Sequence, residues 1–203
     1  MRLVRLFAAS RRMPAAVLTL AGCGVALSLV LRWTAGVTPA LALVLVGAAA
    51  AVVGAAMQSP FDESERATGP RLPLLRLAGA LGLTAAAYAA LAAGATAGHL
   101  TSGAGGLLRD TVGLVGVALF AGGLAGANRS WTGVLAYVFL ALAAADNGWT
   151  TPWLWPARPP SDTAAALCAT AVFLVGAGVA TVGTVHPRWM KPVVLRAAPR
   201  LGG

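Results

Sequence analysis

The chain has 203 residues, of which 58% are hydrophobic and only 10% are charged, against roughly 25% charged in a soluble domain. Its net charge of +9 could suggest nucleic-acid binding. Because the basic residues flank apolar stretches, membrane topology and anionic lipid headgroups explain the charge better, so we expect the lipid bilayer as a partner and no nucleic acid.

The first element is residues 1–13, where Leu3 and Phe7 recur at helical spacing and Arg2 and Arg5 lie beside them. A basic amphipathic helix of this kind lies in the headgroup region of a membrane. The pattern predicts a short interfacial helix. The alternative is a positively charged anchor for the next segment.

Six apolar stretches follow, and a helix needs about 20 residues to cross a hydrocarbon core of about 30 Å. Five stretches meet that length or nearly do, whereas the fifth is short unless Asn128–Ser130 joins it. We therefore predict an all-α polytopic membrane protein, with a six-helix transmembrane domain over 14–185 and a basic tail over 186–203. The stretches are Pro14–Leu31, Pro39–Met57, Leu74–Ala97, Leu107–Ala127, Trp131–Ala145 and Thr163–Val185.

The basic residues orient this domain. If the N-terminus is cytoplasmic, 12 of the 15 Lys and Arg residues lie inside, and only Arg32, Arg109 and Arg158 lie outside. Short loops beside membrane spans carry such an excess on the cytoplasmic side. We expect both termini to be cytoplasmic, in the inner (plasma) membrane of a bacterium whose GC-rich genome would explain the Arg-, Ala- and Gly-rich composition.

One hydrophilic segment, 58–73, is predicted to be cytoplasmic. It holds Asp62, Glu63 and Glu65, which are half of the acidic residues in the chain. An acidic cluster does not favour contact with anionic lipid, and it favours a protein partner that carries Arg or Lys.

A second hydrophilic segment, 146–160, is predicted to be external. It carries Trp149, Trp153 and Trp155, half of the six tryptophans. Since indole rings prefer the membrane interface, we expect this segment to dip into the headgroups, where its tryptophans are candidates for an external gate.

The sequence has few residues at positions suited to catalysis or to binding a cofactor. It has no phosphate-binding loop, and its single lysine is Lys191 near the tail, so the chain is not expected to hydrolyse ATP alone. His99 is predicted outside and His186 inside, which separates them for a metal or haem and separates Ser102 from His186 for nucleophilic catalysis. We expect no enzyme activity, no metal and no cofactor.

Arg109 and Asp110 are predicted at the outer end of the fourth span. A topological or structural role is the simpler interpretation, and a gating or substrate role is the alternative. No carboxylate is expected at the bilayer midplane, where a proton- or ion-coupled carrier would need one.

The order of these parts resembles the permease subunits of ABC-2-type ATP-binding-cassette transporters. In that family a coupling helix between spans two and three contains an acidic run followed by Arg, a small residue and Thr, and the chain has Glu63-Ser-Glu65-Arg66-Ala67-Thr68 at that place. Short re-entrant helices between spans five and six are also common there, where this chain has Trp149–Trp155.

The resemblance implies a permease subunit, more of the exporter type, in which two copies or one copy and a related permease enclose a pathway. A separate cytoplasmic ATPase subunit would dock on Asp62, Glu63, Glu65, Arg66 and Thr68. The alternatives are a solvated loop that only separates two helices and, for the whole chain, a non-catalytic membrane anchor or assembly subunit.

Overall fold

The computed structural model describes residues 13–33, 39–58, 72–97, 103–126, 129–149 and 151–182. Over these ranges the chain is helical and contains no strand, so the all-α prediction is confirmed and each predicted stretch corresponds to one long helix. The interfacial helix expected over 1–13 (except Met13, which begins α2), the loop residues 59–71 and the tail 186–203 lie outside the described residues. The elements are α2 (Met13–Trp33), α3 (Pro39–Met57), α5 (Leu72–Thr96), α6 (Gly103–Ala125), α7 (Ser130–Asp146), η3 (Trp155–Ala157) and α8 (Thr163–Val182).

The surface of the helices matches a multi-pass membrane protein. Five helices are long and apolar enough to cross a membrane, and α7, with 17 residues, is shorter, about 25 Å at 1.5 Å per residue. Large apolar side chains face outward: Leu18 is 73% exposed, Leu167 71% and Phe139 69%. Apolar exposure on this scale is unfavourable in water and suits contact with lipid.

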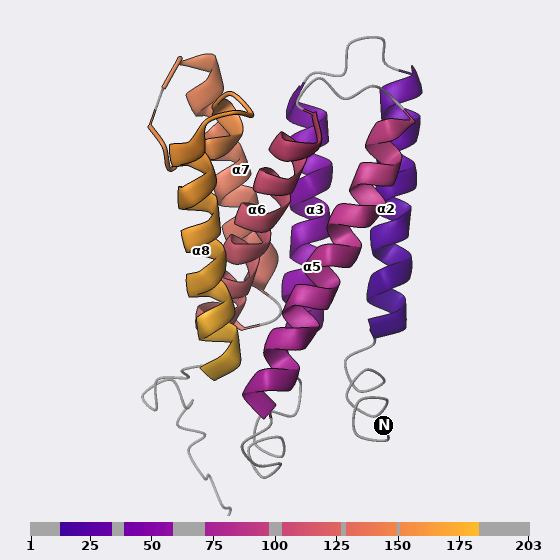
Figure 1. The fold of residues 1–203 in the computed structure, drawn as a ribbon, viewed down its shortest axis with the longest axis vertical. Helices are drawn as coiled ribbons and strands as arrows, with labels where there is room; N and C mark the ends of the chain where they lie inside the picture. Colours follow the sequence, from indigo (N-terminus) through magenta and orange to yellow (C-terminus); the bar gives the residue numbers. More distant parts are fainter. Residues whose placement is uncertain are drawn as a thin grey trace, which may run out of the picture.

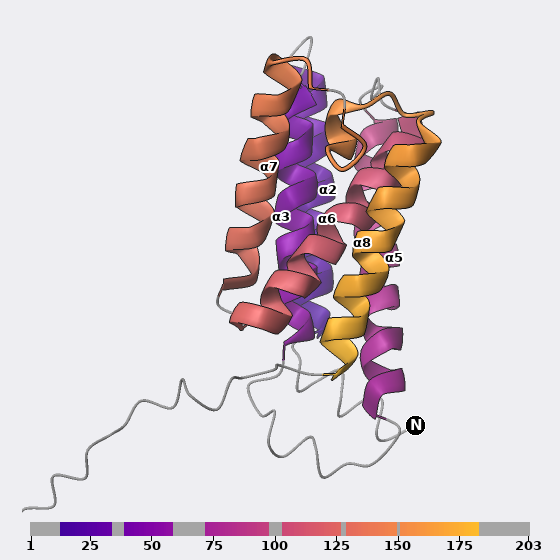
Figure 2. The same ribbon diagram turned by 90° about the vertical axis from the view of Figure 1, so that its left-hand side faces the viewer.

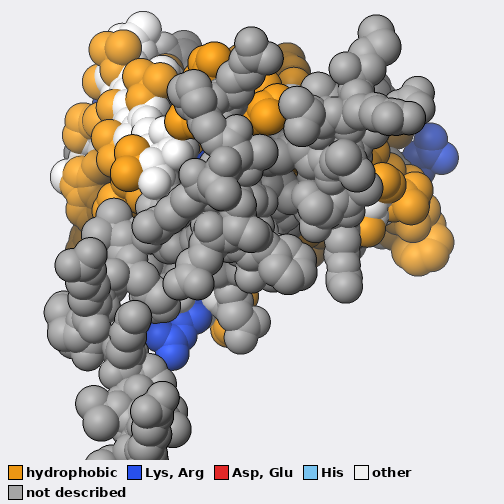
Figure 3. All heavy atoms as spheres, turned by 90° about the horizontal axis from the view of Figure 1, so that it is seen from below, with side chains coloured by type: hydrophobic (Ala, Val, Ile, Leu, Met, Phe, Trp, Pro, Cys, Tyr) orange, Lys and Arg blue, Asp and Glu red, His pale blue; other side chains and the backbone are white. Residues whose placement is uncertain are grey.

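The six long helices alternate in direction, so α2 begins and α8 ends at the same end of the bundle (Figures 1 and 2). We call this the lower end, after its place in Figure 1, and the opposite one the upper end. The arrangement agrees with the prediction that both termini are on one side, while the identity of that side stays a prediction. Figure 3 views the lower end, where the visible described surface is mostly hydrophobic with isolated Arg side chains.

The core is centred on α6 and α3. Helix α6 is the most enclosed of the candidate spans, because 61% of its apolar 18-residue stretch is buried. It contacts α3, α5, α7 and α8. It approaches α3 closely at Gly54, where a Cβ atom would lie 2.8 Å from the Cβ of Ala118. The small residues at this crossing allow close packing of the two backbones.

Helices α2 and α5 cross through a pair of glycines. A Cβ atom on Gly24 would lie 2.9 Å from the carbonyl carbon of Ala90, and one on Gly94 would lie 3.0 Å from the carbonyl carbon of Gly24. Because both helices run upward, this is a parallel crossing (Figure 1). Neither glycine leaves room for a side chain.

Helices α6 and α8 repeat this crossing in the opposite direction. A Cβ atom on Gly116 would lie 2.6 Å from the backbone nitrogen of Phe173, and one on Gly176 would lie 3.0 Å from the carbonyl carbon of Gly116. At the α2–α5 crossing, Gly24 meets Ala90 one turn before Gly94. In the same way, Gly116 meets Phe173 about one turn before Gly176.

The sequence around the two crossings is also repeated. Residues 19–27 and 111–119 both read Thr, four residues, then Gly-Val-Ala-Leu, and the glycine of each copy is the crossing glycine. The hydroxyl groups of Thr19 and Thr111 each donate to the carbonyl four residues earlier, at 2.9 and 2.7 Å. The chain therefore contains two three-helix halves, α2–α3–α5 and α6–α7–α8, that share a pairing scheme and run in opposite directions.

Candidate functional site at the upper end of the bundle

The segment between α7 and α8 folds back over the upper end of the bundle instead of projecting from it. After α7 the chain turns at Gly148, whose φ of +67° favours glycine. Residues 151–162 then lie between the upper ends of α7 and α8 (Figure 2), and η3 contacts α6, α7 and α8. We call residues 151–162 the upper segment.

Trp155 anchors the upper segment. Its side chain is 1% exposed and packs with Ala165 and Ala169 of α8. Its ring stacks on Tyr137 of α7, with a centroid distance of 4.6 Å and an interplanar angle of 25°. On the α6 side it lies against Gly113, where a Cβ atom would be 2.5 Å from its Cε2 atom. The indole Nε1 is buried and has no hydrogen-bond acceptor within the described parts of the chain.

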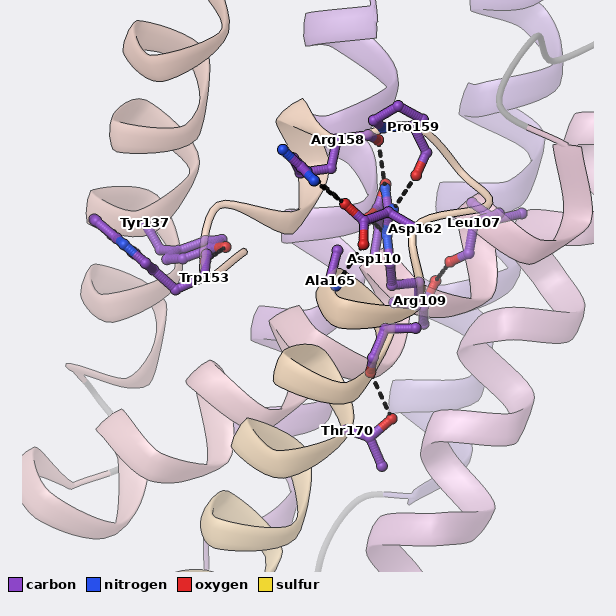
Figure 4. A network of polar contacts seen from close by, with 12 residues as sticks. Leu107, Arg109, Asp110, Tyr137, Trp153, Arg158, Pro159, Asp162, Ala165 and Thr170 are labelled. Atoms are coloured by element: carbon purple, nitrogen blue, oxygen red, sulfur yellow. Dashed lines mark hydrogen bonds and ion pairs between the residues drawn. The ribbon is translucent and has the colours of Figure 1, made fainter. Parts of the chain in front are cut away.

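Arg109 connects α6 to the backbone of the upper segment (Figure 4). Its Nη1 donates to the carbonyl oxygen of Pro159 at 2.8 Å, and its Nη2 donates to that of Arg158 at 3.1 Å. Its Nε donates to Oδ1 of Asp110 at 3.2 Å. The Arg109 side chain is only 5% exposed, so its charge is stabilised by these carbonyls and by the neighbouring carboxylate.

Asp162 fixes the other end of the upper segment. Its Oδ1 accepts hydrogen bonds from the backbone N–H groups of Ala164 and Ala165 at 2.9 and 3.2 Å, which caps α8. Its Oδ2 forms an ion pair with Arg158. The backbone N–H of Ala165 and then the Arg158 side chain hold the pKa of Asp162 below its ordinary value.

Tyr137 adds a hydrogen bond from α7. Its hydroxyl donates to the carbonyl oxygen of Trp153 at 2.7 Å. Two helices thus hold the upper segment through three of its backbone carbonyls. The arrangement is suited to positioning a short piece of backbone.

The structure treats the predicted gate residues differently. Trp155 is buried, whereas Trp149 is 51% exposed and Trp153 47% exposed, so their placement at a membrane interface remains a prediction. Arg109 contacts the upper segment, to which Trp155 belongs, and Asp110 forms an ion pair with Arg109. Because α6 begins at Gly103, earlier than Leu107, the charged pair lies in the second turn of this helix; its depth in a membrane stays a prediction.

Other predicted or basic residues lie elsewhere. Asp62, Glu63, Glu65, Arg66 and Thr68 fall outside the described residues. Arg76, one of the 12 basic residues expected on the inside, lies within α5 and is buried. No group of His, Cys, Asp and Glu in the described ranges could hold a metal ion.

Sequence reasoning missed Tyr137 and Gly113. The chain has only two tyrosines, and each donates to a backbone carbonyl, Tyr88 to Ala104 at 3.5 Å and Tyr137 to Trp153. The rarity of tyrosine could have drawn attention to Tyr137. Gly113 could not have been singled out in this way, since glycine is common in this chain.

No family model, no curated protein and no solved structure matches this chain.

Proposed function

We propose that the chain is the membrane-spanning permease subunit of an ATP-binding-cassette transporter, of the exporter type, and that it works with a separate ATPase and a second permease subunit. The observation that carries the proposal is the position of α3, the helix that leads into the acidic segment 59–71. Helix α3 contacts α2, α5, α6 and α7, so a force applied where α3 ends at Met57 reaches both halves of the bundle.

The packing of α3 supports transmission of such a force. Ala49, Ala50 and Val53 are fully buried, and Gly47 approaches α7 closely enough that a Cβ atom would lie 3.2 Å from Val138. Close-packed interiors have low compressibility and pass on small displacements. A docked ATPase at the acidic loop would therefore act on the centre of the bundle and not on an isolated loop.

The location of the acidic loop also supports the proposal. Helix α3 ends and α5 begins at the lower end, where α2 begins and α8 ends (Figure 1). The loop therefore starts and finishes on the face opposite the upper segment. Under the proposed topology, this face is cytoplasmic, where a soluble ATPase is available.

The decisive experiment reverses the acidic charges. In the variant Glu63→Lys with Glu65→Lys, co-purification of the ATPase and substrate-stimulated ATP hydrolysis should fall, because loss of a charge pair buried in an interface costs about 2–5 kcal/mol. The matched control is Asp146→Lys, a charge reversal on an exposed residue at the upper end of α7. Membrane insertion should be unchanged in both variants.

The rival function, a membrane anchor or assembly subunit, has a different outcome in the same preparation. Purification in mild detergent should bring down a protein with a phosphate-binding loop that hydrolyses ATP. Isolation with redox or cell-envelope subunits, together with unchanged ATPase co-purification and ATP hydrolysis in the double variant, would favour the membrane anchor or assembly subunit over the permease.

The topology is tested separately. A cysteine at Thr150 should react with a membrane-impermeant reagent in intact cells, and a cysteine at Ala198 should not. The reverse pattern would place the acidic loop outside and remove it from any cytoplasmic ATPase.

A further inference from the structure

The upper segment is attached to the surrounding helices by side-chain hydrogen bonds and by buried apolar side chains. Arg109 of α6 and Tyr137 of α7 donate hydrogen bonds to backbone carbonyls of the segment, and at the end of the segment Asp162 accepts hydrogen bonds from the backbone N–H groups of Ala164 and Ala165 of α8. Apart from these, Leu154 and Trp155 hold it through burial, at 0% and 1% exposure. The two ends of the segment are defined by the turn at Gly148 and the helix cap at Asp162.

The site of Trp155 is an imperfect one for an indole. A buried N–H group without an acceptor destabilises the state in which it is buried, and Nε1 of Trp155 is such a group. This unfavourable contact favours departure of the ring. Loss of the apolar contacts with Tyr137, Ala165 and Ala169 opposes it, so the two states are closer in free energy than for a fully satisfied side chain.

The space that Trp155 fills exists because residue 113 is glycine. A Cβ atom there would lie 2.5 and 2.6 Å from Cε2 and Cζ2 of the indole. If the ring leaves, an apolar space the shape of an indole remains between α6, α7 and α8. We call this space the Trp155 socket.

An apolar groove lies next to the socket. It runs between α6 and α8 and is lined by Phe120, Ala171, Val172 and Val175. Val172 also packs against the cluster around Trp155. Figure 2 shows the upper segment between the upper ends of α7 and α8.

We propose that residues 151–162 form a strap that closes the upper end of this groove, with Arg109 as its latch, and that release of the strap joins the groove to the Trp155 socket. The open path would take an apolar cargo with a flat aromatic group, which fits the vacated socket. The role in cargo exit rests on the proposed function, whereas the release of the strap does not.

The test measures exposure of Leu154, which is buried only while the strap is closed. Leu154→Cys is combined with Gly113→Ala, whose methyl group occupies the socket, or with Arg109→Gln, which removes the charged latch. The protein is purified in nanodiscs, and its labelling by a polar maleimide is followed at residue 154 by peptide mass spectrometry. Both changes should raise the labelling rate at least about tenfold, a shift of about 1.4 kcal/mol in the closed-to-open equilibrium.

Two controls separate strap release from general loosening. Gly105→Ala is a matched substitution in α6, because a Cβ atom at Gly105 meets nothing within 4 Å, and it should leave labelling unchanged. Leu114→Cys reports on the α6 core, where Leu114 is fully buried, and it should stay unlabelled in every background. Unchanged labelling at residue 154, or equal increases at residues 114 and 154, would overturn the strap.

Indole tests the socket itself. Added to the protein that carries only Leu154→Cys, it should raise labelling at residue 154 several-fold and saturably, and it should have no further effect in the Gly113→Ala background. If indole has no effect on the first protein, the socket does not accept an aromatic guest. No ATPase is present in these experiments, so their failure leaves the charge-reversal result at Glu63 and Glu65 unaffected.

Discussion

The first and last three helices of the chain cross in the same way but are enclosed very differently. In α2, 22% of the apolar 18-residue stretch is buried, against 61% of the corresponding stretch in α6. Thr19 is exposed and Gly22 meets no neighbour, whereas the corresponding Thr111 and Leu114 are fully buried. A shared local sequence can thus specify how two helices cross, while the elements packed around them decide what is buried.

The largest effect is expected from Gly116→Ala at the enclosed crossing. The new methyl group would press on the backbone of Phe173, and α6 cannot move away because α3, α5 and α7 surround it. Overpacking of this kind costs about 3 kcal/mol. Unfolding in a denaturant series, followed by circular dichroism, gives the value.

Gly178→Ala is the control for that substitution, because its Cβ atom meets nothing within 4 Å. It should be neutral or slightly stabilising, as alanine is the better helix former. Equal stability of the two variants would show that α6 and α8 do not cross at Gly116.

A smaller effect is expected from Gly24→Ala in the first half. The contact with Ala90 is similarly close, but most of the surface of α2 is not covered by other helices, so α2 can shift outward. We expect about 1–2 kcal/mol, measured in the same way, with Gly22→Ala as control. A loss at Gly24 as large as that at Gly116 would mean that enclosure does not govern the cost.

The sequence predicts the helices well because their length and hydropathy are local properties. The six stretches needed no tertiary information. The repeat of Thr, four residues and Gly-Val-Ala-Leu was also visible, but only the crossing geometry distinguishes it from chance in a chain with 25 glycines.

The site at the upper end was predictable only in part. The tryptophans and Arg109 attracted attention by their residue types. Their meeting depends on contacts across about 50 positions, such as that from Arg109 to Pro159, which no local pattern contains. The environment of Trp155 likewise depends on an absent side chain at Gly113.

The start of the third helix in each half provides a pH-dependent comparison. Helix α8 begins directly after Asp162, whose carboxylate caps it, whereas the residue directly before α5 in the sequence is Arg71. Because the pKa of Asp162 is lowered in the folded state, its contribution to stability is present above the unfolded pKa of about 3.9 and is lost as pH falls through the lower folded value.

Substitution at Asp162 should therefore lower the melting temperature at pH 7 and have progressively less effect below about pH 4. Asp162→Asn keeps a capping oxygen and loses the ion pair with Arg158, so it should lose less than Asp162→Ala. Thermal melts of both variants across pH check this order. A difference from the unaltered protein that is independent of pH would assign the effect to packing and not to the carboxylate.

The smallest effect distinguishes the two tyrosines, one in each half. Tyr137→Phe removes a hydrogen bond of 2.7 Å to Trp153 and keeps the ring that stacks on Trp155, so it should cost about 1 kcal/mol. Tyr88→Phe removes a contact of 3.5 Å to Ala104, which is long for a hydroxyl donor, and should cost less than about 0.5 kcal/mol. The same denaturant series measures both. A larger loss at Tyr88 than at Tyr137 would mean that the first half, and not the second, depends on a tyrosine to hold its upper connection.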